Sequence, residues 1–184
     1  MSNYVIVDGE LYHYGVKGMK WGHRKAQKYA SRTERKYARA GKKRGQADYY
    51  REKGDLAAQK HNRTAEVFDK QAKKSEARGE YFKAEASRRA ANAIRARGAN
   101  EQASNHELAS YYEARATKIT EKASTYATKK RVDLGKKRVD QILNDYRTKG
   151  YNYAKEADEF DREMKLQNTL GSSGYNAYNK IRGK

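Results

Sequence analysis

The stretch that decides the fold of this chain runs from residue 100 to residue 148 and reads NEQASNHELASYYEARATKITEKASTYATKKRVDLGKKRVDQILNDYRT. Apolar and tyrosine side chains recur in it mostly at intervals of three, four or seven residues, which is the spacing of one face of an α-helix. They are Leu108, Tyr112, Ile119, Ala123 and Tyr126, followed by Val132, Val139, Leu143 and Tyr146. The pattern predicts one long helix over residues 100–148.

A short repeat lies inside this stretch. The unit KKRVD occupies residues 129–133 and returns at residues 136–140. A period of seven places both copies on the same face of a continuous helix, with Val132 and Val139 toward a partner helix and the basic triplets around the other side. The repeat therefore favours an extended molecule, and self-association into a homo-oligomer is one way to supply the partner helix.

The surrounding sequence is also typical of helices. From His23 to about Tyr153 the chain is dominated by Ala, Lys, Arg, Glu and Gln, which are good helix formers, and proline is absent. Glycine is the only strong helix-breaking residue present. Taking the glycines as helix ends, we expect helices near residues 23–40, 46–77, 80–97, 100–148 and 151–168. The run Gly171-Ser172-Ser173-Gly174 predicts a flexible tail.

The supply of large apolar residues limits the core. Leu, Ile, Val and Phe together number 21 of 184 residues, about 11%, which is below the ~20% at which a high net charge signals disorder. The chain instead has 26 Ala and 16 Tyr. Either it folds as thin helical pairs packed through Ala and Tyr, or it becomes fully ordered only on a partner.

The N-terminus has a different pattern. Residues 4–7 are β-prone, Asp8-Gly9 suits a tight turn, and residues 10–14 resume the strand pattern, so a β-hairpin is expected. The predicted fold is thus mainly α, with a small N-terminal hairpin followed by long Ala/Tyr-packed helices in an extended or thin bundle. We divide the chain into a hairpin and docking module (1–25), a basic helical body (26–168) and a flexible tail (169–184).

The formal net charge of +19 is unevenly distributed. Residues 24–45, the first basic segment, hold ten Lys/Arg and one Glu, and residues 128–149, the second basic segment, hold eight Lys/Arg and three Asp. Residues 46–127 interleave sixteen Lys/Arg with twelve Asp/Glu, which is typical of a solvated helix surface. The cations within each basic segment repel one another. A phosphate backbone would offset this repulsion, and its counterions would be released on binding.

We therefore predict that both basic segments bind nucleic acid without reading its sequence, with an acidic protein surface as the alternative partner. The candidate residues of the first segment are Arg24, Lys25, Lys28, Arg32, Arg35, Lys36, Arg39, Lys42, Lys43 and Arg44. Those of the second segment are Lys129, Lys130, Arg131, Lys136, Lys137 and Arg138. Four tyrosines lie within the first segment or just after it, either to stack on unpaired bases or to pack the core: Tyr29, Tyr37, Tyr49 and Tyr50.

No constellation for catalysis is found in the sequence. Cysteine is absent, and the four histidines (His13, His23, His61 and His106) have no metal-ligand spacing. Four carboxylates between Asp158 and Glu163 lie within two helical turns but point several ways, which favours a solvated surface. We expect no enzymatic activity, no metal and no cofactor. No apolar run approaches the ~20 residues that cross a bilayer, and no secretion signal is found, so we expect a chain that is neither secreted nor transmembrane.

One segment, residues 12–25, carries a specific motif. It reads YHYGVKGMKWGHRK, in which three glycines permit tight turns around a Val, a Met and the only Trp. Those apolar residues could fill one hydrophobic site on a partner, or Trp21 could pack the hairpin onto the first helix. The candidate docking residues are His13, Gly15, Val16, Gly18, Met19, Trp21 and Gly22.

This segment resembles a short module, HxGVKGMKWG[VH]R[RK], of virion-associated (minor head) proteins in tailed phages and prophages of Gram-positive bacteria. The match is close at residues 13–25, with His23 where Val is more usual. The resemblance implies a phage-encoded protein whose docking tag attaches it to phage head proteins, in the virion and the host cytoplasm. Our hypothesis is a non-enzymatic structural or internal virion protein, and the alternative is a phage inhibitor of a host defence system, similar in role to anti-CRISPR proteins.

Overall fold

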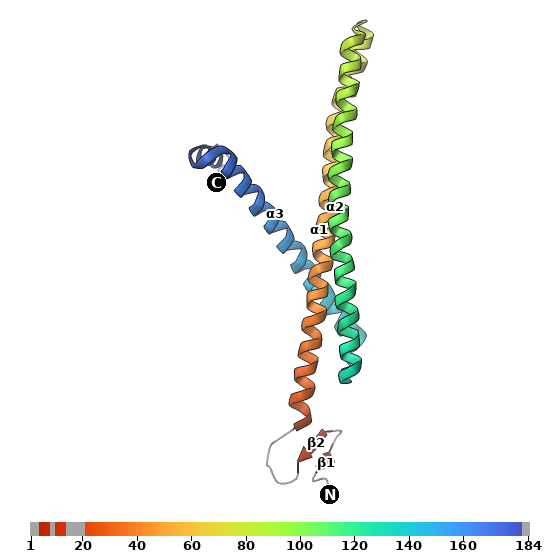
Figure 1. The fold of residues 1–184 in the computed structure, drawn as a ribbon, viewed down its shortest axis with the longest axis vertical. Coiled ribbons are helices and arrows are strands. Elements are labelled where there is room, and N and C mark those ends of the chain that lie inside the picture. Colours follow the sequence, from red (N-terminus) through yellow and green to blue (C-terminus); the bar gives the residue numbers. More distant parts are fainter. Residues whose placement is uncertain (1–3, 8–9, 14–20, 182–184) are drawn as a thin grey trace.

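The computed structural model describes residues 4–7, 10–13 and 21–181, with side chains from Lys25 onward except at positions 172, 173, 177 and 181. Its fold is mainly helical, as predicted. Three helices follow one another along the chain: α1 (Trp21–Ala77), α2 (Tyr81–Lys130) and α3 (Lys136–Ile181). Figure 1 shows α1 and α2 as a long antiparallel pair, with α3 crossing the pair obliquely and then leaving it.

Two short strands precede the helices. β1 (Tyr4–Val7) pairs antiparallel with β2 (Glu10–His13), so that Tyr4 lies opposite His13 and Val7 opposite Glu10. The turn residues between them lie outside the described residues.

The α1–α2 pair is held by a seam of small residues. The buried positions of α2 recur every seven residues, first at Ala84, Ala91, Gly98 and Asn105 and then at Ala109, Ala116 and Ala123. The facing helix α1 buries Ala40, Ala47, Gly54, Ala65 and Ala72. Seven-residue steps, broken once by a step of four on α2 and once by a step of eleven on α1, keep one face of each helix turned toward its partner. Small side chains on that face allow two long helices to pack with very little aliphatic material.

Close approach of a neighbouring helix explains why three predicted helix breaks are wrong. We expected interruptions at residues 41–45, 98–99 and 149–150, but α1, α2 and α3 run through all of them. These glycines lie where another helix approaches. A Cβ added at Gly98, for example, would lie 2.6 Å from the Cβ of His61 on α1. Close helix packing therefore compensates the ~1 kcal/mol that each glycine costs a helix.

Gly79 does end a helix, as predicted. It has a φ of 74°, a left-handed conformation that glycine adopts readily, and its N–H donates to the Glu76 carbonyl at 2.9 Å. The Glu80 N–H returns to the Ser75 carbonyl at 2.9 Å. These bonds close the tip of the α1–α2 hairpin.

The predicted single helix over residues 100–148 is wrong, because the chain turns at residues 131–135. Arg131 has a left-handed backbone (φ 52°) and caps α2, and Val132 donates its N–H to the Ala127 carbonyl at 2.9 Å. Asp133 then accepts the N–H of Gly135 at 2.8 Å, and Gly135 has a φ of 69°. The two KKRVD units therefore end one helix and begin the next, and they do not share a helix face.

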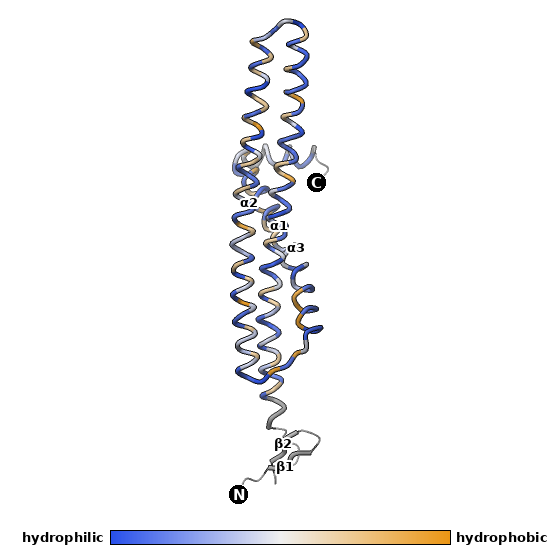
Figure 2. Tube along the Cα trace, turned by 90° about the vertical axis from the view of Figure 1, so that its right-hand side faces the viewer, coloured by the Kyte–Doolittle hydropathy of each residue, from blue (hydrophilic) through white to orange (hydrophobic). Residues whose placement is uncertain are grey.

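The third helix supplies the large aliphatic side chains of the core. Ile142 and Leu143 of α3 are buried against Tyr37 and Ala40 of α1 and Ala123 of α2. In Figure 2 the first turns of α3 are conspicuously apolar among otherwise hydrophilic helices. This three-helix core lies at the end of the pair opposite the tip.

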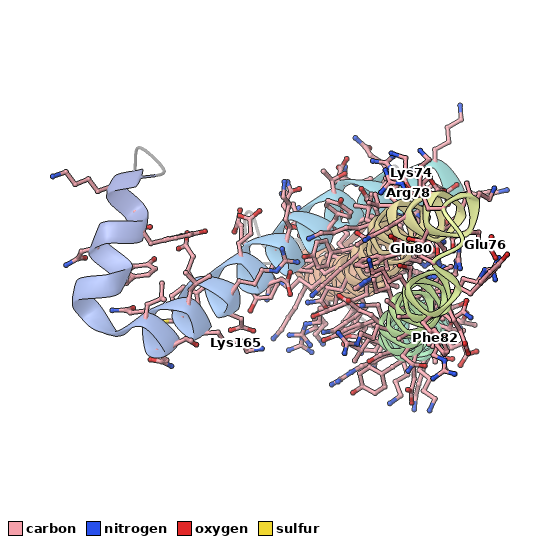
Figure 3. All side chains as sticks on the ribbon, turned by 90° about the horizontal axis from the view of Figure 1, so that it is seen from above. Lys74, Glu76, Arg78, Glu80, Phe82 and Lys165 are labelled. Carbon is pink, nitrogen blue, oxygen red and sulfur yellow. The ribbon has the colours of Figure 1, made fainter. Side chains whose placement is uncertain are left out.

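Beyond the crossing, α3 extends away from the pair. Figure 3, seen along the pair from its tip, shows the later part of α3 with Lys165 far to one side of Phe82 at the tip. A kink at Gly171 (φ 67°) marks the start of the expected tail, but residues 172–181 after it are helical.

Candidate nucleic-acid interface

The two basic segments lie at the same end of the molecule. The α2 helix runs back along α1, and α3 starts where α2 ends, so residues 128–149 return to the first half of α1. We define the basic end as residues 25–45 of α1, 115–130 of α2 and 131–149 of the following turn and α3. The two basic segments, 24–45 and 128–149, carry net charges of +9 and +5, and so +14 of the chain's +19.

The first segment forms a stripe along α1. Six of its cations follow one another at alternating intervals of three and four residues, and all six are exposed: Lys25, Lys28, Arg32, Arg35, Arg39 and Lys42. This spacing places them on one face of the helix. Lys36, Lys43 and Arg44 are half-buried at the edges of the stripe. The side chain of Arg24 lies outside the described part of the chain.

The second segment is fastened to the first by direct contacts. Arg138 donates its Nε–H to Oε1 of Glu34 at 3.1 Å, and the Lys130 ammonium lies 5.2 Å from the centre of the Tyr29 ring. Arg35 and Arg138 line one cavity of about 250 Å³ between α1 and α3. The structure thus brings the predicted residues of both segments together. All six of the second segment are exposed: Lys129, Lys130, Arg131, Lys136, Lys137 and Arg138.

Ion pairing differs sharply between the two ends. Among the described side chains of residues 25–45, the ion pair between Glu34 and Arg138 is the only one found. Toward the tip, cations of α1 and α2 are instead neutralised by neighbouring carboxylates. The pairs there are Arg88 with Glu76, Arg89 with Glu85, Arg95 with Asp69, and Lys83 with Glu80. Apart from Arg138 and Arg147, no cation among the described side chains of the basic end has a carboxylate within ion-pair distance.

The interleaved tyrosines belong to the core. Tyr37 and Tyr49 are each only 8% exposed. Tyr50 stacks on Tyr112 of α2, with ring centres 5.6 Å apart and planes 7° apart, and Tyr49 meets Tyr151 of α3 edge to face. Aromatic rings in such contacts are not free to receive bases, so the structure favours the packing role of these tyrosines over stacking.

Ring faces also hold several cations of the basic end. The ammonium groups of Lys36, Lys43 and Lys149 lie within 5.2 Å of the ring centres of Tyr126, Tyr112 and Tyr146. A cation over a ring face is stabilised without losing its charge. This arrangement positions the lysines while leaving their field uncompensated.

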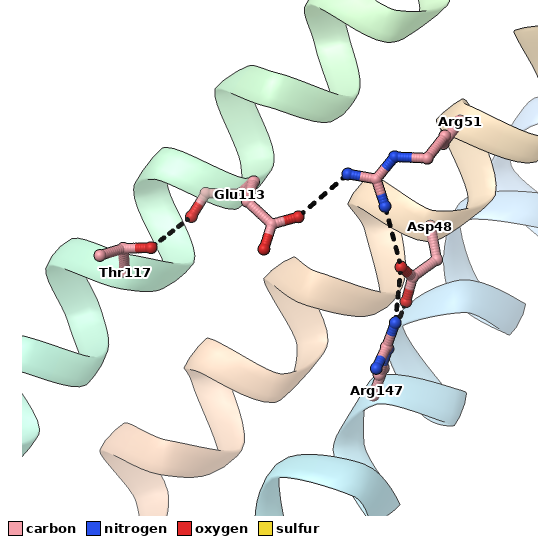
Figure 4. Close-up of polar contacts among 5 residues, drawn as sticks. All are labelled: Asp48, Arg51, Glu113, Thr117 and Arg147. Carbon is pink, nitrogen blue, oxygen red and sulfur yellow. Dashed lines mark hydrogen bonds and ion pairs between the residues drawn. The ribbon is translucent and has the colours of Figure 1, made fainter.

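A chain of ion pairs joins the three helices at the border of the basic end (Figure 4). Arg147 of α3 donates two hydrogen bonds to Asp48 of α1, at 2.5 and 2.9 Å, and these bonds raise the pKa of its guanidinium. Arg51 lies 3.5 Å from the same carboxylate and 3.2 Å from Glu113 of α2. The bidentate Arg147 pair fixes the crossing of α3 over α1.

Sequence reasoning missed the contribution of α2. Arg115, Lys118 and Lys122 are exposed on the basic end, although they lie in the segment of mixed charge. Their spacing of three and four residues, continued by Lys129 seven residues later, was the signal that could have found them. A stripe on α2 thus accompanies the stripe on α1.

The docking residues are only partly described. His13 ends β2, and Trp21 and Gly22 begin α1. Gly15, Val16, Gly18 and Met19 lie outside the described residues, and the side chains of the other three do as well. The docking prediction for this segment stays a prediction.

The histidines and carboxylates outside the basic end make helix-to-helix contacts. His61 lies 3.3 Å from Glu101, and His106 lies 2.9 Å from Asp55, in both cases joining α1 to α2. Within the residues that the structure describes, no group of three metal-ligating side chains is found. In the same part of the chain, no helix is long and apolar enough to span a bilayer.

The environment of Asp158 differs from the one that the sequence predicted. The acidic residues 158–163 were expected to form a solvated surface, but Asp158 is half-buried and accepts hydrogen bonds from Tyr49 (2.7 Å) and Lys53. Burial alone would raise the pKa of Asp158, and these two bonds, with the charges of Lys53 and Arg162, outweigh it and lower the pKa. This carboxylate holds α3 against α1.

The geometry defines an elongated helical protein with one strongly basic end. Residues 4–28 match DUF7211, a family of unknown function. Searches of curated proteins and of solved structures give no match. The family match covers the N-terminal hairpin, the whole docking segment and the first residues of α1.

Proposed function

We propose that this chain is a non-enzymatic, phage-encoded virion protein that binds DNA through its basic end without reading the sequence. The single observation that carries the DNA-binding part is the convergence of the two basic segments, with little internal neutralisation. A solvated surface would gain nothing from assembling +14 at one end of the fold. A polyanion would supply the missing negative charge.

The dimensions of the α1 stripe suit a duplex. From Lys25 to Lys42 a helix rises about 26 Å at 1.5 Å per residue. Over that length duplex DNA presents about fifteen phosphates. Six exposed cations on one face can contact several of these phosphates together, and contacts to phosphates carry no sequence information.

The test is fluorescence anisotropy with a random-sequence DNA duplex at 50 and 200 mM salt. If about six phosphates are contacted, affinity should fall roughly a thousandfold between these two concentrations. A salt-insensitive affinity, or no binding at 50 mM salt, would contradict the proposal and favour an acidic protein as the partner.

Two variants that lose the same charge distinguish DNA binding at a local surface from a general effect of net charge. One replaces six cations of the second basic segment by Gln: Lys129, Lys130, Arg131, Lys136, Lys137 and Arg138. The matched control replaces by Gln six exposed cations in the half of the α1–α2 pair toward the tip: Lys60, Arg63, Lys70, Lys73, Lys74 and Arg97. The first variant should weaken binding and flatten its salt dependence, and the control should change both much less. Equal losses would show that net charge alone is responsible.

The virion part of the proposal rests on the resemblance of residues 12–25 to the phage module. A structural protein should be recovered by mass spectrometry from purified particles in a fixed copy number. Expression early in infection, with absence from particles, would contradict a virion role and favour the inhibitor of host defence.

A further inference from the structure

A groove lies on the basic stripe of α1, at the point where α2 and α3 both flank it. Its α1 wall is made by Arg39, Lys42 and Lys43, and Arg115 of α2 and Tyr153 of α3 line the other sides. The groove has a volume of about 410 Å³. Such a volume accommodates a ligand of several atoms with multiple contacts, rather than a single surface ion pair.

The close approach of α3 creates the groove. A Cβ added at Gly150 would lie 2.1 Å from the backbone oxygen of Lys42, so the two helices meet there at the backbone. One turn later α3 places Tyr153 at the rim, and this side chain is 64% exposed. The helices that form the groove are held by the three-helix core beside it.

The charge inside the groove is uncompensated. Four cationic side chains line it, and no carboxylate does. Lys43 donates to the Gln46 amide oxygen at 2.7 Å, and Arg115 donates to the Tyr111 hydroxyl at 2.8 Å. Both partners are neutral, so these bonds orient the cations without cancelling their charge. Burial, together with the nearby Arg115, lowers the pKa of Lys43.

We propose that this groove is a discrete binding site for a phosphoryl anion with at least two negative charges, such as adjacent phosphates of a nucleic-acid strand or a free oligophosphate. This inference deepens the proposed function, on which it rests where the phosphates belong to DNA. Arg115 offers its planar fork to two phosphate oxygens, and the lysines act as point charges around the remaining ones.

Isothermal titration of the full chain with inorganic tripolyphosphate tests the site directly. The double variant Lys43→Gln/Arg115→Gln removes two cations of the groove. The control Lys73→Gln/Lys74→Gln removes the same charge from two exposed positions near the tip. We expect one strong site in the wild type, a loss of tenfold or more in the groove variant, and a loss below threefold in the control. Equal losses in the two variants, or no saturable binding, would overturn the inference.

A second groove variant covers the case in which the first one unfolds. Arg39→Gln/Lys42→Gln changes two side chains that are exposed, so its helix content by circular dichroism should equal that of the wild type. It should lose tripolyphosphate affinity at least fivefold. Unchanged affinity in this folded variant would exclude the groove as the site.

Competition with DNA identifies the source of the phosphate and separates the two proposals. If strand phosphates occupy the groove, tripolyphosphate should displace a labelled duplex, and the groove variant should weaken both ligands. Tripolyphosphate bound without displacing the duplex would support a free oligophosphate. If the chain binds DNA but not tripolyphosphate, the groove inference is overturned and the proposed function stands. If it binds tripolyphosphate but not DNA, the proposed function is overturned and the groove inference stands.

Discussion

Arg138 at the start of α3 donates its Nε–H to the Glu34 carboxylate of α1 at 3.1 Å, across 104 residues of sequence. Glu34 is the only acidic residue of the first basic segment, and it is engaged by the second one. The contact therefore holds two mutually repulsive segments side by side while cancelling little of their charge. The three-helix core and the Arg147–Asp48 pair hold α3 on α1 independently of this contact, so the basic end is one surface rather than two.

Replacing Glu34 by Gln should strengthen DNA binding. The change removes the sole carboxylate of the first segment, so affinity at low salt should rise roughly two- to fivefold because one nearby repulsion is lost. The pair is half exposed, and its loss should cost at most about 1 kcal/mol of stability. Glu66→Gln, an exposed change on α1 about 30 Å along the helix from the basic end, is the control for anisotropy titrations and should have almost no effect. Weaker binding by the Glu34 variant would contradict this account.

Gly45→Ala should separate α3 from α1. The added Cβ would lie 1.8 Å from the backbone oxygen of Arg147, and backbone cannot move aside as a flexible side chain can. We expect a net cost of about 1–3 kcal/mol despite the gain in helix propensity, and weaker DNA binding because the two basic segments move apart. Thermal unfolding followed by circular dichroism measures the first effect, and anisotropy measures the second.

Gly54→Ala on the same helix is the matched control. Its Cβ would lie 3.0 Å from the His106 side chain, 3.1 Å from the Asn105 Cβ and 3.2 Å from the Gln102 backbone oxygen, so a shift of a few tenths of an ångström relieves all three contacts. Its cost should be smaller than that of Gly45→Ala by at least about 1 kcal/mol. Equal effects of the two substitutions would argue against a special role for the α1–α3 crossing.

Ala91→Leu should destabilise the α1–α2 pair. Ala91 is fully buried in the seam of small residues, and a larger side chain would force the helices apart at a cost of about 1–3 kcal/mol. Ala93→Leu places the same side chain on an exposed position two residues away and should change stability by no more than about 0.5 kcal/mol. Urea unfolding compares the two, and a tolerated Leu at position 91 would show that the seam is loosely packed.

Asp158 should make the docking of α3 sensitive to acid. Its pKa in the folded chain is lowered, so its stabilising effect is present above the unfolded pKa of ~3.9 and is lost as pH falls through the folded value. At pH 7, Asp158→Asn should cost about 1–3 kcal/mol because Lys53 and Tyr49 lose a charged partner. The difference in unfolding free energy between wild type and variant should shrink below about pH 4. A constant difference from pH 7 to pH 3 would refute the role assigned to this carboxylate.

Much of the helical content could be predicted because Ala, Lys, Arg and Glu favour helices wherever they pack. The predicted helix boundaries were wrong at glycines such as Gly45 and Gly98. In sequence, a glycine that allows two helices to approach closely looks the same as one that ends a helix. The seven-residue recurrence of Ala84, Ala91 and Gly98 was readable in principle, but the search for large apolar residues passed over it.

The residues of the two basic segments were predicted from the sequence, but the α2 residues and the assembly of the candidate site were not. The apolar stripe continues at helical spacing on both sides of residues 131–135. The turn there could therefore not be recognised from the apolar pattern. The Asp133-Leu134-Gly135 run was the local signal, because Asp caps a turn and Gly adopts positive φ. Once this turn is recognised, α3 must return to α1, and the two basic segments meet.

The central claim, that both basic segments contact the same DNA, is tested most directly by photocrosslinking. Benzoylphenylalanine would be placed singly at Arg35 on α1, at Lys137 on α3 and, as the control, at Lys73 near the tip, and each protein irradiated with a labelled random-sequence duplex. We predict crosslinks from positions 35 and 137 in comparable yield, both lost in high salt, and little from position 73. Crosslinking from only one of the two segments, or equal crosslinking from the tip, would contradict a single DNA-binding surface at the basic end.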